Sequence, residues 1–481
     1  MLSAKEIAAL LGPEVPTPEQ EAIIEGAPGG TFRVVAGAGS GKTETMAQRV
    51  VWLIANSHVS ASGVLGLTFT KKAARELSTR IRSHLASLAQ AGIGVETDEF
   101  VGPTVSTYNA FAAGLYREHA TLLGRDPDAS VLSEASAWAL TRSVVVASTQ
   151  PELESLGMDP AAVTNAVRRL SQRLAENPVP QEAMDRLVAE LSALRDLPPG
   201  GRGAYADVGK AIGAVERLPL FTALVAEAAE AKRLRGVLEF SDQIALGLEL
   251  IERFGHIRDQ LTDTFGAVLL DEYQDTAVAQ TTLLSKIFGQ HPVMAVGDPH
   301  QAIYAWRGAS SANLTDFEHA FGPKVISATL STSWRNGIRV LDAANCVAEP
   351  LRALPGPTAE VLTPRQGADA LAPTVVFPAT LEEEAAQVAS WCAEHLSQSS
   401  GSTPASAAVI LRARAHQKVF VDALTREGVP VHVLGIGGLL EDPAIADVVC
   451  TLRVLAHPHA ETELLRLLTG ARWRLGVADL R

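Results

Sequence analysis

The sequence predicts an α/β protein built around a parallel sheet. A strand-length apolar run at residues 31–35 leads through a glycine-rich turn into a helical pattern at residues 44–56. Further apolar runs at residues 64–69, 266–270 and 292–297 are each followed by polar residues and then by helical spacing. Strands that alternate with helices in this order form parallel sheets, and such sheets bind ligands at the carboxyl ends of their strands.

Length and composition predict several domains. The chain has 481 residues, too many for one hydrophobic core, and its 47% hydrophobic and 20% charged residues are typical of a globular protein. The apolar runs are far shorter than a membrane span, and the first residues lack a signal-peptide core. We therefore expect a cytoplasmic protein with no membrane partner. The net charge of −13 argues against a nucleic-acid partner, but a local basic or aromatic groove can bind a strand on an acidic protein.

The turn after the first strand has the composition of a phosphate-binding loop. Its residues are Ala36, Gly37, Ala38, Gly39, Ser40, Gly41, Lys42 and Thr43. Glycines at positions 39 and 41 let backbone N–H groups turn inward around a phosphate. The lysine supplies a point charge to the β- and γ-phosphates, and the threonine hydroxyl is a ligand for Mg²⁺. A glycine-rich turn with an accidental lysine is the alternative, but the flanking strand and helix favour a nucleoside triphosphate site.

Two more stretches add residues to this site. Thr17 as N-cap and Pro18 at the first helical position place Gln20 in a first turn, where its amide could read an adenine edge. Asp271 and Glu272 follow an apolar strand. We interpret Asp271 as a Mg²⁺ ligand through water, and Glu272 as the group that orients and deprotonates the attacking water. The structural alternatives are an ordinary polar residue in a first turn and an ordinary surface pair of carboxylates.

A further polar and aromatic stretch follows the strand at residues 292–297. Gln301 is placed to sense a γ-phosphate. Tyr304, Trp306 and Arg307 bring two aromatic rings and a guanidinium into four residues. In a loop these groups would form a stacking platform for bases, whereas in a packed helix they would belong to the core.

Lys71 and Lys72 begin a helix after the strand at residues 64–69. Positive charge is unfavourable at a helix N-terminus, so these residues would be explained by contact with a phosphate. The alternative is a solvated charged face.

The middle and the end of the chain have different patterns. Residues 112–236 have helical spacing with breaks near 124–128, 177–180 and 197–203, which predicts a helical insertion with no recognisable chemistry of its own. Strand-length runs at residues 325–330, 374–377, 407–411 and 431–434 suggest a second α/β domain, and the pattern from residue 435 onward is helical.

Taken in order, these motifs closely resemble the superfamily 1A DNA helicases of the UvrD/Rep/PcrA type over nearly the whole chain. The two most specific matching runs are residues 271–276 and 297–309. Within that group, residues 35–52 and 104–111 resemble the AdnB-type motor of actinobacterial helicase–nucleases.

The resemblance implies a P-loop NTPase fold with two RecA-like domains, each carrying an insertion. It implies an ATP-hydrolysing 3′→5′ DNA helicase, or single-strand translocase, in DNA repair or recombination, with ATP and Mg²⁺ between the two domains. The catalytic residues would be Lys42, Asp271, Glu272, Gln301 and, as an arginine finger, Arg335. Trp334 stands where the family usually has a Tyr or Phe stacked on adenine. We expect single-stranded or partially duplex DNA as partner, together with a second helicase–nuclease subunit.

The residues expected to bind DNA are Phe69, Lys71, Tyr108, Asn109, Tyr304, Trp306 and Arg307. Asn109 stands where many relatives have His. The expected domains are 1–110 and 239–324 for the first RecA-like domain, 111–238 for its helical insertion, 325–434 for part of the second RecA-like domain, and 435–481 for the start of its insertion.

One departure from the family pattern gives two hypotheses. The family has a later Lys-Gly-Leu-Glu-like run and a late arginine that contacts the γ-phosphate, and neither occurs before Arg481. We therefore expect a C-terminally truncated chain with an incomplete second RecA-like domain. The first hypothesis is a DNA-unwinding motor. The second is an ATP- and single-strand-binding module with little turnover. An unrelated P-loop ATPase is disfavoured, because the aromatic platform would then have no purpose.

Overall fold

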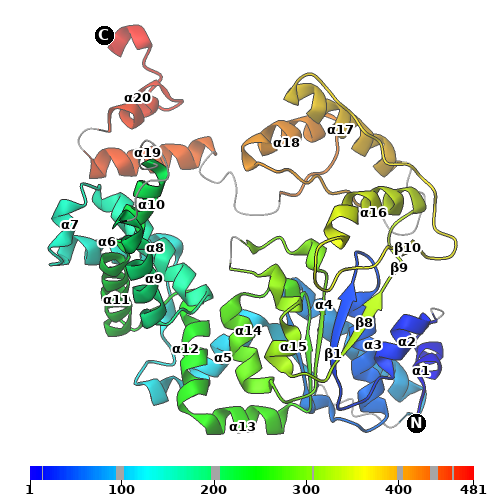
Figure 1. The fold of residues 1–481 in the computed structure, drawn as a ribbon. Coiled ribbons are helices and arrows are strands. Elements are labelled where there is room, and N and C mark those ends of the chain that lie inside the picture. Colours follow the sequence, from blue (N-terminus) through cyan, green and yellow to red (C-terminus); the bar gives the residue numbers. More distant parts are fainter. Residues whose placement is uncertain are drawn as a thin grey trace. The chain divides into compact units, whose positions relative to one another are not determined.

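The computed structural model describes residues 1–12, 15–93, 102–196, 206–305, 308–397, 405–433, 442–457 and 460–480 (Figure 1). The chain divides into two compact units, Met1–Ala372 and Pro373–Arg481. The predicted α/β class is confirmed by a parallel sheet in the first unit.

Six parallel strands form the central sheet of the first unit, in the order β3-β2-β6-β7-β1-β8. Their bounds are β1 (Thr31–Ala36), β2 (Val64–Thr68), β3 (Thr104–Thr107), β6 (Ala267–Leu270), β7 (Val293–Gly297) and β8 (Val325–Leu330). Strand β7 pairs with β1 on one side and with β6 on the other. The loop after β1, the carboxylates after β6 and the polar stretch after β7 therefore leave the same edge of the sheet.

Helices cover both faces of this sheet (Figure 1). One face packs against α3 (Lys42–Ala55) and α4 (Lys71–Gln90), and the other against α5 (Tyr108–His119), α12 (Phe240–Arg253), α14 (Val278–Phe288) and α15 (Phe317–Phe321). Successive residues of β6 alternate between the two cores, with Leu269 in the first and Leu270 in the second. Strands buried on both faces explain the continuous apolar runs in the sequence.

Two short helices precede the sheet, α1 (Ala4–Leu11) and α2 (Pro18–Ile24). The predicted start of α2 is confirmed, because Thr17 is its N-cap and Gln20 completes a capping box. Arg49 of α3 holds the turn that connects α2 to β1. The residue is 3% exposed, and its guanidinium donates to the carbonyl oxygens of Ile24 at 2.9 Å, Gly26 at 2.5 Å and Ala27 at 2.8 Å.

The helical insertion lies between β3 and β6. Its helices are α6 (Glu134–Ala147), α7 (Glu152–Ser155), α8 (Pro160–Glu176), α9 (Gln181–Ala193), α10 (Ala206–Val215) and α11 (Leu218–Leu234). A small core that includes Val145, Val163 and Leu224 joins α6, α8 and α11. At the base of the insertion, β4 (Ser130–Val131) pairs in parallel with β5 (Val237–Leu238). The segments that enter and leave the insertion therefore lie side by side.

The strand at residues 325–330 does not begin a second domain as we expected. It completes the first sheet, because β8 pairs with β1 from Thr31 with Val325 to Ala36 with Leu330. The apolar run predicted a strand correctly, but a run carries no information about which strand it pairs with. The rest of the first unit contains α13 (Gly255–Thr264), β9 (Thr332–Ser333), α16 (Ile338–Arg352) and β10 (Thr363–Pro364).

The second unit is helical where the structure describes it. It contains α17 (Leu381–Ser397), α18 (Gln417–Arg426), α19 (Pro443–Ala456) and α20 (Glu461–Thr469), and α17 packs on α18 through Ala389, Cys392 and Phe420. The strands predicted at 374–377, 407–411 and 431–434 are absent from the described residues, which exclude residue 434. Phe377 and Ile410 are more than 90% exposed. An apolar run becomes a strand only where a neighbour accepts its backbone hydrogen bonds, and the described residues supply none.

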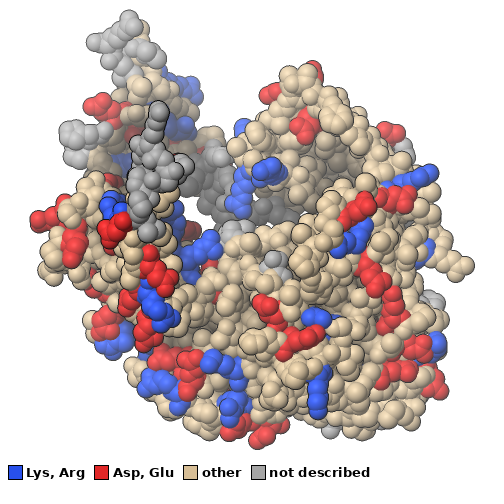
Figure 2. All heavy atoms as spheres, in the orientation of Figure 1, with Lys and Arg blue, Asp and Glu red and all other residues tan. Residues whose placement is uncertain are grey.

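The surface carries both signs of charge. Figure 2 shows Lys and Arg side chains interspersed with Asp and Glu over the described part of the face in view. Among the described residues, no helix combines the length and apolar character needed to cross a membrane.

The Arg49 contacts give a first testable prediction. Arg49→Met would leave three carbonyl oxygens without their donor, of which that of Ile24 is buried, so we expect a loss of about 3 kcal/mol in the free energy of unfolding. Chemical unfolding followed by tryptophan fluorescence measures it. Arg253→Met, which removes a half-exposed arginine paired with Glu249 at 2.8 Å, should cost less than about 1 kcal/mol. Equal losses in the two variants would contradict the role given to Arg49.

Candidate nucleotide site

The loop from Ala36 to Thr43 has the backbone of a phosphate-binding turn. Gly39 and Gly41 have φ angles of 75° and 80°, in the left-handed region that favours glycine. The Ser40 hydroxyl donates a buried hydrogen bond to Gly37 O at 2.9 Å, which stabilises the turn. Gly41 is the N-cap of α3 and no side chain caps this helix. The first N–H groups of α3 are therefore available to an anion, as the sequence predicts.

The predicted catalytic lysine and glutamate lie together. Lys42 Nζ is 3.4 Å from Glu272 Oε2, and the lysine side chain is 12% exposed. Glu272 has a φ angle of 47°, which is uncommon for a residue other than glycine. Strained backbone of this kind is concentrated at functional sites, because the surrounding structure must hold it.

Asp271 is buried at the end of β6. It is 4% exposed, and its carboxylate accepts the Glu272 N–H at 3.0 Å. Burial, reinforced by the neighbouring Glu272, raises the pKa of Asp271 to about 7, although Lys42 opposes the shift. A buried carboxylate with so little compensation suits a cation. Mg²⁺ prefers oxygen ligands and binds proteins through one or two carboxylates together with the phosphates of its substrate.

Thr43, the other predicted metal ligand, is half-buried in the first turn of α3. The described residues contain no group of three or more His, Cys, Asp or Glu side chains that could hold a metal by themselves. The assignment of Thr43 and Asp271 as Mg²⁺ ligands stays a prediction.

A buried glutamine connects the carboxylates to the next strand. Gln274 is 1% exposed, and its Nε2 donates to Glu272 Oε2 at 2.8 Å. Its Oε1 accepts the Asp298 N–H at 3.0 Å. Gln301 Nε2 in turn donates to Asp298 Oδ2 at 2.5 Å. The chain of contacts therefore runs from Lys42 through Gln274 to the predicted γ-phosphate sensor.

Sequence reasoning missed the connecting role of Gln274 and Asp298. Both lie inside the motifs that the sequence singles out: Gln274 is four residues past the end of β6, and Asp298 directly follows β7. Their position could have indicated the role, because polar side chains at the ends of neighbouring parallel strands lie close enough to bond.

The residues expected near adenine lie over the end of the loop. A Cβ built on Gly41 would be 2.8 Å from Gln20 Nε2 and 3.7 Å from Trp334 Cδ1. The backbone N–H of Trp334 donates to Gly39 O at 2.8 Å. The structure therefore brings Gln20, Trp334 and the loop together, although more than 300 residues of sequence separate the first two.

Glu19 secures this arrangement. Its carboxylate accepts the backbone N–H of Ser331 at 2.8 Å and the Ser331 hydroxyl at 2.6 Å. This contact ties the first turn of α2 to the segment that carries Trp334. Arg335 follows with an exposed side chain, and its Cβ would be 2.8 Å from a Cβ built on Gly39. The predicted arginine finger therefore begins beside the phosphate-binding loop, within the first unit.

The residues expected to bind DNA have mixed positions. The rings of Phe69 and Tyr304 stack on each other, with centroids 4.5 Å apart and an interplanar angle of 29°. Lys71 is exposed at the start of α4. Trp306 and Arg307 lie outside the described residues, so their predicted roles stay predictions.

The structure contradicts the predicted DNA contact of Tyr108, and it gives the neighbouring Asn109 a hydrogen bond within the protein. Tyr108 is 4% exposed and its hydroxyl donates to Asp271 O at 2.7 Å. A buried ring with this bond supports the end of β6 and cannot contact DNA, because burial removes it from the surface. The neighbouring Asn109 is exposed, and its Oδ1 accepts Gln280 Nε2 at 2.8 Å.

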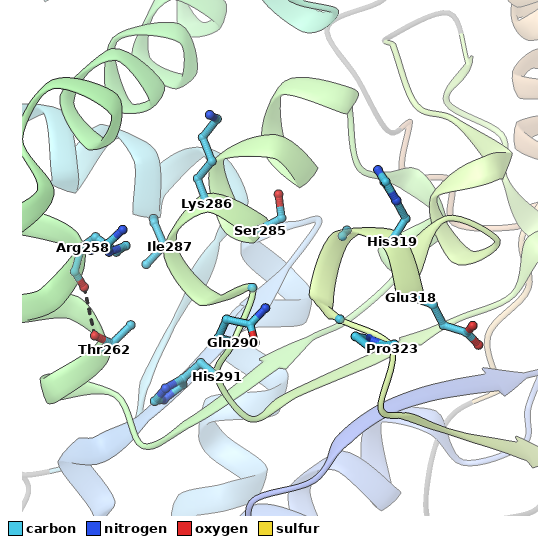
Figure 3. Close-up of a pocket in the computed structure, with 13 residues that line it drawn as sticks. Arg258, Thr262, Ser285, Lys286, Ile287, Gln290, His291, Glu318, His319 and Pro323 are labelled. Carbon is cyan, nitrogen blue, oxygen red and sulfur yellow. Dashed lines mark hydrogen bonds between the residues drawn. The ribbon is translucent and has the colours of Figure 1, made fainter.

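Figure 3 shows a pocket of about 800 Å³, and none of the predicted site residues lines it. Arg258, Lys286, His291 and His319 are among its lining residues. His291 and Pro323 precede β7 and β8, so this pocket lies at the amino ends of the strands, opposite the loop edge. Parallel sheets bind ligands at the carboxyl ends of their strands. This pocket lies at the opposite ends, so it is not the candidate site despite its volume.

The fold and the site are those of a P-loop nucleotide-binding protein. Residues 16–322 match the family model described as the UvrD/REP helicase N-terminal domain, which covers well over half of the chain. The chain belongs to this family, and the predicted resemblance to UvrD/Rep/PcrA helicases is confirmed. The narrower resemblance to AdnB-type motors stays a prediction.

The chain is similar to several curated helicases. It is 28% identical over 470 residues to the ATP-dependent DNA helicase UvrD1 of Mycobacterium tuberculosis, an alignment that covers 96% of this chain and 55% of the relative. It is also 28% identical over 470 residues to UvrD2 of the same species, covering 95% and 60%. PcrA of Staphylococcus epidermidis is 24% identical over 454 residues, covering 94% and 55%. The chain spans a little over half the length of these relatives.

The buried carboxylate gives a prediction about stability and pH. The folded chain holds the Asp271 proton more tightly than the unfolded chain, whose carboxyl pKa is near 3.8. This contribution to stability is present at low pH and is lost as the pH rises from about 4 to about 7. Without Mg²⁺ at pH 8, Asp271→Asn should therefore raise the free energy of unfolding by about 1–3 kcal/mol.

Thermal unfolding of wild type and Asp271→Asn at pH 5 and pH 8 measures this effect. The gain should be much smaller at pH 5, where the folded wild type is already protonated at this position. Asp259→Asn, at a carboxylate that is 65% exposed, should show no such difference. An equal gain at both pH values in Asp271→Asn would show that Asp271 is not the titrating group.

Proposed function

We propose that this chain binds ATP with Mg²⁺ and hydrolyses it to move 3′→5′ along single-stranded DNA, as part of a helicase that acts in DNA repair or recombination. The observation that carries the proposal is the continuous set of contacts from Lys42 through Glu272, Gln274 and Asp298 to Gln301. The chain is similar to ATP-dependent DNA helicases, and this similarity supports the same function.

The proposed chemistry assigns one task to each side chain. Lys42 and the N–H groups of the loop bind the β- and γ-phosphates, and Lys42 leaves Glu272 as it does so. Glu272, once released, accepts the proton of the water that attacks the γ-phosphorus. Thr43 and Asp271 would hold Mg²⁺, which would supply positive charge to the phosphate oxygens. Arg335 stabilises the charge that develops on the γ-phosphate.

Nucleotide state can reach the DNA-binding residues through the same contacts. Asp275, in the stretch that contains Glu272 and Gln274, accepts the Ile303 N–H at 3.2 Å. Ile303 precedes Tyr304, whose ring stacks on Phe69. If Lys42 leaves Glu272 to bind phosphate and Glu272 moves, the movement would therefore reach Ile303, two residues beyond Gln301. We propose that this link couples ATP turnover to the affinity of Phe69 and Tyr304 for a DNA base.

The domain assignment is part of the proposal. The first RecA-like domain comprises residues 1–110 and 239–324 together with β8, and residues 111–238 form its insertion. Residues after β8 up to 434 contribute to a second RecA-like domain, and residues 435–481 begin its insertion. A second helicase–nuclease subunit stays a prediction from the resemblance to AdnB-type motors.

One observation favours the second hypothesis, a module that binds ATP and single-stranded DNA with little turnover. The predicted strands at residues 374–377, 407–411 and 431–434 are unpaired where the structure describes them. ATP hydrolysis with and without single-stranded DNA decides between the two functions, because a motor needs stimulated turnover whereas a binding module needs affinity alone.

We predict that Lys42→Ala abolishes ATP turnover, since it removes the charge that binds the transferred phosphoryl group. A phosphate-release assay with single-stranded DNA measures it. Lys286→Ala, on the far side of the sheet and paired with Glu252 at 3.0 Å, should retain wild-type turnover. Unaltered hydrolysis in Lys42→Ala would exclude this loop as the active site.

We also predict that Phe69→Ala weakens single-strand binding by about 1–3 kcal/mol, the usual effect of losing one stacking ring. Fluorescence anisotropy with a labelled oligonucleotide gives the dissociation constant. The control is Phe240→Ala, which removes a ring that is 63% exposed at the start of α12 and should leave DNA affinity unchanged. The stacking assignment is wrong if the two variants bind DNA equally well.

A further inference from the structure

The indole of Trp334 presents a polar atom that the stacking role does not use. Its Nε1 is buried and has no hydrogen-bond acceptor among the described residues. The other indole groups in the described part of the first unit show the contrast: Trp52 Nε1 donates to Leu2 O at 2.9 Å, and Trp138 Nε1 donates to Asn165 Oδ1 at 2.9 Å. A buried N–H without a partner is unfavourable, and such groups in folded proteins call for an explanation.

The position of this N–H points to the nucleotide. A Cβ built on Gly41 would lie 3.9 Å from Trp334 Nε1 and 2.8 Å from Gln20 Nε2. Both donors therefore face the same end of the phosphate-binding loop. Gly41 directly precedes Lys42, which is expected to take the phosphates, and Gln20 is expected to read the base. A group beside Gly41 and Gln20 thus lies on the nucleoside side of the loop.

The chain holds both donors in place independently of a ligand. Gln20 Oε1 accepts the Thr17 N–H at 3.0 Å in the capping box of α2, which fixes the amide. The backbone N–H of Trp334 is fixed on Gly39 O, and Glu19 ties α2 to Ser331. These hydrogen bonds hold the segments that carry the two donors beside the loop. A donor that is already held in place loses little conformational entropy when it binds a ligand.

We propose that the Trp334 indole N–H donates a hydrogen bond to the nucleoside half of the bound nucleotide, to a base nitrogen or a ribose oxygen. The inference rests on the proposed function and goes beyond it, because a Phe at this position could stack on the base but has no hydrogen-bond donor. Trp334 is then a specificity-determining residue, which favours nucleosides with an acceptor at this point over the triphosphate alone.

Two replacements test the role of the N–H. Trp334→Phe removes it and shortens the ring, whereas incorporation of benzothienylalanine at position 334 replaces the N–H by sulfur and keeps the shape of the ring. Isothermal titration calorimetry with Mg²⁺–ATP and with inorganic tripolyphosphate gives the affinities. We expect both replacements to weaken ATP binding about three- to tenfold, the effect of one hydrogen bond, and to leave tripolyphosphate binding unchanged.

The same two replacements at Trp138, whose N–H already has a protein acceptor far from the loop, are the matched control and should change neither affinity. The proposal is overturned if the benzothienylalanine protein binds ATP like wild type, because stacking alone then explains Trp334. It is also overturned if the ATP and tripolyphosphate affinities fall together, since the replacement then acts on the loop itself. If the wild type binds neither compound, the proposed function is wrong and this inference falls with it.

Discussion

The parallel pairing of β1, β7 and β6 is the constraint on which the candidate site depends. Neighbouring strands lie about 4.8 Å apart, so the loop after β1 and the carboxylates after β6 are separated by roughly 10 Å, with the end of β7 between them. The Lys42 side chain spans this gap to approach Glu272, and Gln274 spans half of it to reach Asp298. A change in strand order would leave these side chains too short to meet.

A second consequence of this arrangement is that the proposed binding of Mg²⁺ and the stability of the fold make opposite demands on Asp271. The sheet holds this carboxylate at the buried end of β6, where burial raises its pKa and makes the charged form costly. The same burial keeps water away from the oxygens that suit a cation. A residue selected for stability alone would be apolar here, so the carboxylate is itself a sign of function.

The sequence could predict the parts of this structure that depend on local chemistry. The start of α2 follows from Thr17 and Pro18, and the loop follows from two glycines that need a positive φ. The positions of most strands in the first sheet follow from apolar runs bounded by polar residues. These features are decided within a few residues of chain, and the same chemistry acts in the unfolded and the folded state.

What the sequence could not predict depends on contacts between distant residues. Strand β8 pairs with β1 because β1 has a free edge in the sheet. The residues 325–330 by themselves do not indicate which strand they pair with. Tyr108 resembles a surface aromatic in sequence, yet its ring is buried because α5 packs on the second face of the sheet. The same limit applies to Gln274, whose two hydrogen bonds join residues from different strands.

The short ladder between β4 and β5 has a consequence for how the chain folds. Strands β2 and β6 are neighbours in the sheet although about 200 residues separate them, and closing so long a loop before any contact forms is slow. Because β4 and β5 hold the two ends of the insertion together, an insertion that folds first reduces this long connection to a short one. The helical insertion can then act as an internal clamp that brings the two halves of the sheet within reach of each other.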